Sequence, residues 1–171
     1  SATDPVLNMF HTANGTATAG SDYVALVDSP ISIAANTTTQ TISVTVNGDT
    51  TVEADETLTI LLDALQAGGR NVTLADAEAI GTITNNDAAT ISIAPATQVE
   101  GNSGTSTMTF NVTLSAAVDV PVTVTLNTTD GTATIANNDY VAVTGGTLTF
   151  NPGDPLTKTF TVTINGDTSI E

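Results

Sequence analysis

The sequence of 171 residues contains no cysteine and no tryptophan, and its only basic residues are Arg70 and Lys158. Without cysteine the chain can form neither a disulfide nor a thiolate metal site. The longest apolar stretch, Leu58–Leu65, includes Asp63 and is far shorter than the ~18–20 residues that cross a bilayer. We therefore predict no membrane span in this segment.

The charge is strongly one-sided. Eighteen acidic residues give a formal net charge of −16 at pH 7. Nucleic acids and anionic membranes attract basic surfaces, so this charge argues against both as partners and favours cations or simple solubility. The abundance of Thr, Val, Ala, Gly and Asn, with no cysteine and little lysine, is typical of secreted bacterial proteins. We predict an extracellular or cell-surface location.

Catalytic constellations are also scarce. His11 is the single histidine, and no nucleophile elbow accompanies it, so a Ser–His–Asp triad is excluded. Asp49 and Glu53 could pair for glycoside hydrolysis. A sugar cleft normally offers aromatic platforms, however, and this chain has only four Phe and two Tyr. We predict that the protein is not an enzyme.

An internal repeat organises the chain. Val162–Glu171 repeats Val44–Glu53, and Gly131-Thr-Ala-Thr repeats Gly15-Thr-Ala-Thr. Self-similarity at a fixed period of about 117 residues indicates a tandem array. We predict that residues 1–87 are the later part of one repeat, with strands C to G, and that residues 88–171 are the earlier part of the next, with strands A to E.

Alternation of apolar and polar residues predicts strands. Met108, Phe110 and Val112 share one face of the segment 107–114, and threonines and an asparagine share the other. Such half-buried strands, separated by Gly, Pro, Asn and Asp turns, suit an antiparallel sandwich of Greek-key type. The seven predicted strands of a repeat, from A to G, are 90–94, 107–114, 121–127, about 140–150, 157–164, 57–63 and 79–84.

In an up-and-down arrangement, the loops A–B, C–D and E–F share one end of the sandwich with the exit from strand G. Most of the acidic residues fall on these segments: Asp22, Asp49, Glu53, Asp55, Glu56, Asp87, Glu100, Asp130, Asp139, Asp167 and Glu171. Like charges this close together repel. A divalent cation could supply the missing counter-charge; the alternative is that the acids are simply solvated.

Carboxylates and backbone carbonyls form an all-oxygen site, which suits Ca²⁺ first and Mg²⁺ second. Calcium accepts ~6–8 oxygens in flexible geometry, whereas magnesium prefers an octahedron and keeps its waters. The sequence contains neither an EF-hand loop nor the glycine-rich calcium nonapeptide.

Several ordered motifs together resemble the Calx-beta repeat of sodium–calcium exchangers and bacterial surface proteins. They are Glu100-Gly101, Gly131-Thr-Ala…Asp139-Tyr140, Gly146…Gly153, Gly48…Glu56 and Gly81-Thr-Ile-Thr-Asn-Asn-Asp87. The resemblance implies a seven-stranded immunoglobulin-like sandwich that can bind calcium at one end. It differs from the calcium-sensing relatives at Gly48 and Gly166, where they carry an acid, and Asn14 replaces the Asp130 of the other unit.

The resemblance also implies a ligand set for each repeat. In the first it consists of Asp49, Glu53, Glu56 and Asp87, and in the second of Glu100, Asp130, Asp167 and Glu171. Asp22, Asp55 and Asp139 are weaker candidates; an Asp before the motif tyrosine can instead cap the turn.

The predicted function is that of a calcium-binding spacer repeat in a large extracellular protein, with neighbouring repeats as partners and calcium stiffening their junctions. One alternative is a self-assembling fibre or surface-layer subunit, in which open sheet edges are completed by strands from other copies. A second alternative is an adhesin module.

Overall fold

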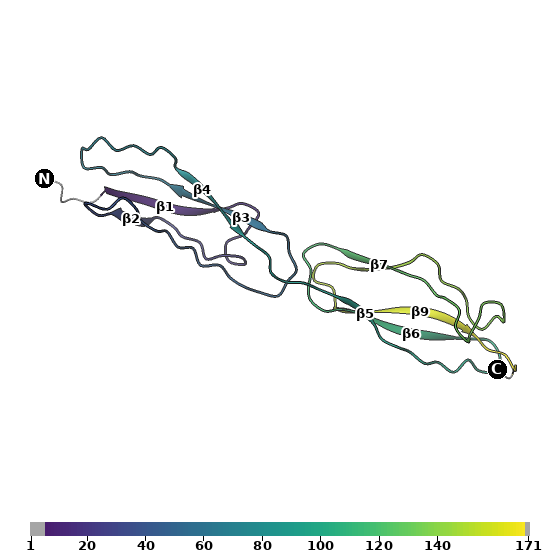
Figure 1. Cartoon of the computed structure of the whole chain (residues 1–171). Helices are drawn as coiled ribbons and strands as arrows, with labels where there is room; N and C mark the ends of the chain where they lie inside the picture. Colours follow the sequence, from purple (N-terminus) through teal and green to yellow (C-terminus); the bar gives the residue numbers. More distant parts are fainter. Residues whose placement is uncertain (1–5, 170–171) are drawn as a thin grey trace. The chain divides into compact units, whose positions relative to one another are not determined.

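The computed structural model describes residues 6–169, which form β-strands and loops (Figure 1). In chain order the strands are β1 (Val6–Asn14), β2 (Ser29–Ile33), β3 (Glu56–Leu62), β4 (Glu78–Ile83), β5 (Ile91–Ile93), β6 (Thr105–Leu114), β7 (Val122–Leu126), β8 (Gly146–Phe150) and β9 (Thr157–Asn165). All the strand pairs are antiparallel. The prediction of an all-β, antiparallel fold is confirmed.

The chain divides into two compact units. One comprises Ser1–Asp49 and Ala54–Asn86, and the other comprises Thr50–Glu53 and Asp87–Glu171. The first unit contains a single sheet with the strand order β2-β1-β3-β4. The second contains a sheet in the order β5-β6-β9 and a two-stranded sheet of β7 and β8. No helix among the described residues is long and apolar enough to cross a membrane.

The second unit is a sandwich because both of its sheets turn apolar faces inward. Phe110 lies opposite Phe160 in the register of β6 and β9, and alternate threonines on these strands point outward. The core combines Val112 and Leu114 of β6 with Phe150 of β8. This burial of aliphatic and aromatic side chains is the main force holding the two sheets together.

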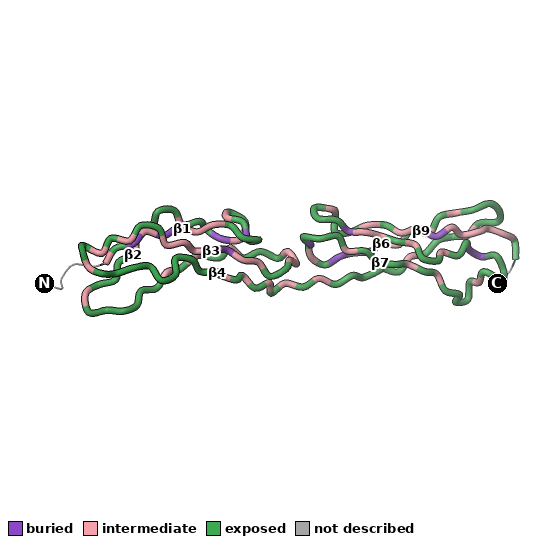
Figure 2. Tube along the Cα trace, turned by 90° about the horizontal axis from the view of Figure 1, so that it is seen from above, coloured by how far each residue is buried: buried purple, intermediate pink, exposed green. Residues whose placement is uncertain are grey.

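The core of the first unit is smaller and lies where β1 ends and β3 begins. It consists of Ala17, Tyr23 and Leu58, which are 0%, 1% and 4% exposed. Figure 2 shows that the buried stretches of this unit are short and that most of its trace is exposed or intermediate. The hydrophobic stabilisation of the first unit is therefore confined to a small part of its sheet.

One strand expected from the repeat is missing in the described part of the first unit. Residues 39–47, the counterpart of β9, form no strand, and within them Val46 makes only an isolated bridge to Tyr23. In the second unit β9 is held along its length by β6. The described residues of the first unit contain no counterpart of β6, so this segment has no neighbour with which to form a ladder. The expectation of a strand E within residues 1–87 is corrected accordingly.

Candidate metal centre

The loops between β1 and β2 and between β7 and β8 have the same internal bonding. The backbone N–H of Thr18 donates to Oδ2 of Asp22 over 2.6 Å, and that of Thr134 donates to Oδ2 of Asp139 over the same distance. Asp-anchored turns of this kind arise because a short carboxylate can reach backbone N–H groups nearby. Both aspartates therefore have the turn-capping role that the sequence suggested for them.

Each of these loops is also hydrogen-bonded to a second segment: the end of β9 in the second unit and the equivalent residue Asn47 in the first. Asn47 donates its backbone N–H to the carbonyl of Asp22, and Asn165 donates to the carbonyl of Asp139, each over 2.9 Å. The amide side chain of Asn47 adds a bond to the carbonyl of Ser21 at 3.0 Å. Each unit thus holds two of its acid-bearing loops side by side through backbone bonds.

A tyrosine hydroxyl fixes the start of each of these loops. Tyr23 donates to Oδ1 of Asn14 over 2.7 Å, and Tyr140 donates to Oδ1 of Asp130 over 2.6 Å. The hydrogen bond to Asp130 raises the pKa of Tyr140, because losing the phenol proton would place two negative charges together. The same Asp130 oxygen accepts the N–H of Ile135 at 3.0 Å. These tyrosine–Asx bonds were not foreseen from the sequence, although the matched spacing of the two motifs was visible there.

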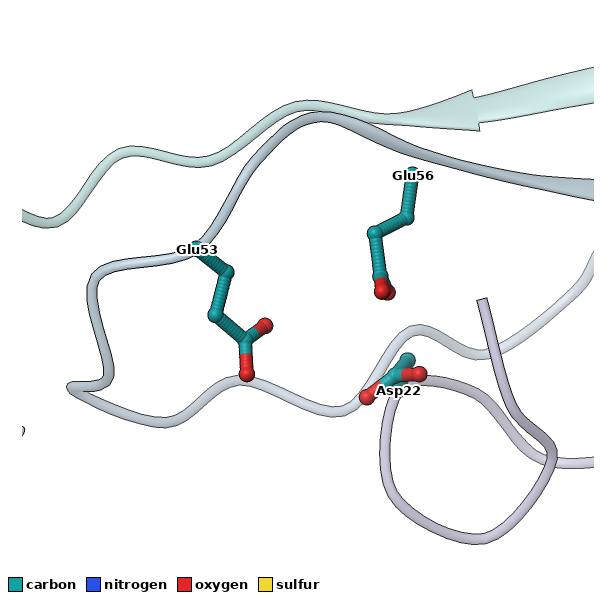
Figure 3. A group of neighbouring side chains, drawn as sticks. All are labelled: Asp22, Glu53 and Glu56. Carbon is teal, nitrogen blue, oxygen red and sulfur yellow. The ribbon is translucent and has the colours of Figure 1, made fainter. Parts of the chain in front are cut away.

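The β1–β2 loop and the chain entering β3 bring three carboxylates together. One oxygen from each of Asp22, Glu53 and Glu56 lies within 4.8 Å of the others, and all three residues are half-buried. Glu56 is the first residue of β3, and Glu53 precedes it in the loop. Figure 3 shows their side chains converging on the side chain of Asp22, which comes from the β1–β2 loop. We call these three residues the acid triad.

The electrostatics of the acid triad favour a cation. The N–H of Thr18 lowers the pKa of Asp22, against the opposing effect of burial, and contacts with Ser21 and Glu56 lower it further. Asp22 is therefore ionised at neutral pH. Carboxylates confined within 4.8 Å repel one another unless a proton or a cation intervenes. Three half-buried carboxylates form an all-oxygen donor set. Such a set fits Ca²⁺, which accepts flexible geometry, better than Mg²⁺, which requires a stricter octahedron.

The other ligands predicted for the first repeat lie outside the acid triad. Asp55 accepts the backbone N–H of Asn85 over 2.9 Å and so joins the β3 entry loop to the chain after β4. Asp49 is exposed and Asp87 is half-buried, and both take part in other interactions. Of the predicted set, the structure places Glu53 and Glu56 together and adds Asp22, which the sequence had ranked lower.

In the second unit the predicted ligands lie on neighbouring loops. A side chain at Gly166 would approach the carbonyl of Glu100 to 2.7 Å, so the loops that carry Glu100 and Asp167 touch. Asp167 accepts the N–H of Ser169 over 2.6 Å, and Asp139 is almost fully buried. Glu171 lies outside the described residues. Between residues 6 and 169, no further group of three acids has the close spacing of the acid triad.

Comparison with known proteins identifies two copies of one domain. The profile of the Calx-beta domain matches residues 1–89 and 84–171. Among solved structures, the chain is similar to CBD12 from CALX1.2, with 21% identity and a TM-score of 0.44, over 96% of this chain and 65% of that one. It is also similar to the calcium binding domain CBD12 of CALX1.1, with 22% identity and a TM-score of 0.44, over 96% and 64%. The chain thus spans slightly less than two thirds of the length of either structure. No curated protein matches it.

Proposed function

Because the chain belongs to the Calx-beta family, we propose that it is a non-catalytic calcium-binding repeat of a larger extracellular or cell-surface protein. Its partners in this proposal are the neighbouring repeats of the same protein. The excess of eighteen acidic over two basic residues supports a role with cations rather than with nucleic acid.

The observation that carries this proposal is the acid triad. Three acids, one from the β1–β2 loop and two from the chain at the entry to β3, place carboxylate oxygens within 4.8 Å of one another. A bound Ca²⁺ would supply the positive charge that removes their repulsion. Asp22, Glu53 and Glu56 would each offer a carboxylate oxygen, and backbone carbonyls and water would complete the shell. The triad thereby joins the β1–β2 loop to the entry of β3.

Stiffening of the chain between repeats is the mechanical consequence that we propose. Only residues 84–90 separate β4 from β5, and Asp87 lies within this link. Asp55, next to Glu56, accepts a hydrogen bond from the backbone N–H of Asn85. Ordering the loop of Glu53 and Glu56 with calcium would therefore restrict the motion of the link, as a spacer between repeats requires.

The experiment is thermal unfolding with calcium and with a chelator. A ligand that binds only the folded state stabilises it by about 2.7 kcal/mol at a hundredfold excess over Kd, so Tm should rise by roughly 10 °C or more. Glu56→Gln keeps the side-chain shape but removes a charge, and it should abolish most of this rise. Glu78→Gln, the same change at the other end of the β3–β4 pair, should retain it. Equal melting temperatures for the wild type with calcium and with chelator would refute calcium binding.

A further inference from the structure

Each unit has a left-handed residue in the loop ahead of its motif tyrosine. In the first unit it is Gly20, with a φ of 101°, and in the second it is Asn138, with a φ of 64°. Glycine loses much conformational entropy when it is fixed in this way, and an asparagine adopts this conformation only where surrounding contacts hold it. Both loops therefore need bonds from another part of the chain to stay ordered.

One asparagine side chain supplies such bonds in each unit. The amide Nδ2 of Asn165 donates to the carbonyl of Asn138 over 2.9 Å, and Oδ1 of Asn138 lies 3.4 Å from the same nitrogen. The amide Nδ2 of Asn47 donates to the carbonyls of Gly20 at 3.2 Å and Ser21 at 3.0 Å. Both amides direct their two N–H groups at the loop, and in both units the left-handed residue is an acceptor.

This contact persists although the two loops differ in length and sequence. Asp22 lies seven positions after Gly15, whereas Asp139 lies eight positions after Gly131. In both units, nevertheless, the amide reaches the carbonyl of the residue directly before the aspartate. Any residue except proline can donate a backbone bond at such a place, but two side-chain donors require an amide. The asparagine, rather than the sequence of the loop, therefore accounts for the shared contact.

We propose that Asn47 and Asn165 are positioning residues, whose amides lock the loops that carry Asp22 and Asp139. Asn47 precedes the segment that continues to Glu53, so its lock fixes the carboxylate of Asp22 relative to the chain that leads to another member of the acid triad. In the second unit Asn165 has the same place relative to Asp139. The lock acts with or without a metal ion, and only its consequence for calcium affinity rests on the proposed function.

Replacing the amide by a carboxylate separates this role from simple packing. Asn47→Asp keeps the shape of the side chain, but it removes both N–H donors and directs an acceptor at two carbonyl oxygens, which repel it. Asn47→Ala removes the donors without adding this repulsion. The lock is therefore weakened more by Asn47→Asp than by Asn47→Ala. A side chain that only filled space would give the reverse order.

The first test is amide hydrogen exchange of the whole chain with chelator present. Thr18 reports on the first loop, because its N–H is bonded to Asp22. Asn47→Asp should speed exchange at Thr18 by about tenfold or more, the equivalent of about one hydrogen bond, and Asn47→Ala should speed it less. Faster exchange in Asn47→Ala than in Asn47→Asp would overturn the proposal.

The second unit and an exposed loop supply the controls. Asn165→Asp is the mirror variant and should speed exchange at Thr134, whose N–H is bonded to Asp139, while Thr18 exchanges as in the wild type. Asn71→Asp adds the same charge in the exposed loop between β3 and β4 and should leave both reporters unchanged. Wild-type exchange at Thr134 in Asn165→Asp would also overturn the proposal, even if Asn47→Asp failed to fold.

The second test is calcium titration of the whole chain, followed by the amide shifts around Asp22. Asn47→Ala should weaken calcium binding by roughly threefold to tenfold, because Asp22 is no longer held in place. Asn165→Ala should bind at the acid triad like the wild type. A wild type that binds calcium no more tightly than Asn47→Ala would contradict the positioning of Asp22. A wild type that binds no calcium would instead refute the proposed function, and the exchange test alone would decide the lock.

Discussion

The two units contain the same loop motif, yet they bury it differently. Ala17 is fully buried in the first unit, whereas its counterpart Ala133 is exposed in the second. Both belong to a Gly-Thr-Ala-Thr sequence, so local preference cannot explain the contrast. The difference comes from β3, whose Thr57 carbonyl accepts the N–H of Ala17 at 2.9 Å. Long-range pairing, rather than the motif, decides what is buried.

The second unit, in turn, has a sheet and a larger core that the first unit lacks. The second unit has the β5-β6-β9 sheet and a core around Val112 and Phe150. The first unit has a smaller core, and the segment equivalent to β9 is not a strand. The comparison shows what the additional strands do in each unit. In the first, β3 pairs with β1 and buries the Gly-Thr-Ala-Thr loop; in the second, β6 and β9 fill the interior.

The largest expected effect comes from the matched glycines. Gly15→Ala should destabilise the first unit by about 1–3 kcal/mol, because its Cβ would overlap the Thr57 carbonyl. Gly131→Ala should leave the stability of the second unit nearly unchanged in the single chain. Hydrogen exchange measured separately for each unit checks both values. Equal losses would show that the two edges are equivalent after all.

A second prediction concerns the acceptors of the tyrosine hydroxyls. Asp130→Asn gives the second unit the neutral acceptor that Asn14 provides in the first. The pKa of Tyr140 should then fall toward its ordinary value of 10.0, because the charge that opposes ionisation is gone. NMR of the tyrosine ring carbons during a titration to high pH follows this. An unchanged midpoint would exclude Asp130 as the cause.

A smaller effect is expected at the turn before β9. Lys158 lies 2.6 Å from Asp154 and, with the N–H of Asn151, lowers the pKa of that carboxyl from 3.8 to about 2. A depressed acid pKa stabilises the folded turn above pH 3.8, and this contribution is lost as the pH falls toward 2. In the first unit the residue equivalent to Asp154 is Thr37, which carries no charge that a pH change could remove. Amide shifts between pH 5 and pH 2 should therefore move at Asn151 and Asp154 but remain constant around Thr37.

Much of the fold was predictable because its strands alternate strictly. The segment 107–114 was predicted from Met108, Phe110 and Val112, and it lies within β6. The absence of the expected strand E at residues 39–47 is equally instructive. Val44-Thr-Val matches the alternating Val162-Thr-Ile of β9, but alternation can specify only which face of a strand is apolar. It cannot supply the neighbouring strand that completes the ladder.

The kind of candidate site, a cluster of carboxylates, was easier to predict than the residues that form it. Glu53 and Glu56 were expected ligands, and they lie together. Asp22 was ranked lower because an aspartate before the motif tyrosine can cap a turn. In the structure it caps the turn through Thr18 and also belongs to the acid triad. Sequence spacing could not show that the carboxylate of Asp22 both caps the turn and belongs to the acid triad, because this depends on how the β1–β2 loop folds toward the entry of β3.

Calcium titration followed by amide NMR tests the central claim most directly. Saturable shifts should appear around Asp22, Glu53 and Glu56, should disappear in Glu56→Gln, and should persist in Glu78→Gln. Calcium-induced shifts that survive Glu56→Gln unchanged, or a spectrum that calcium leaves unaltered, would contradict the assignment of the acid triad as the calcium site.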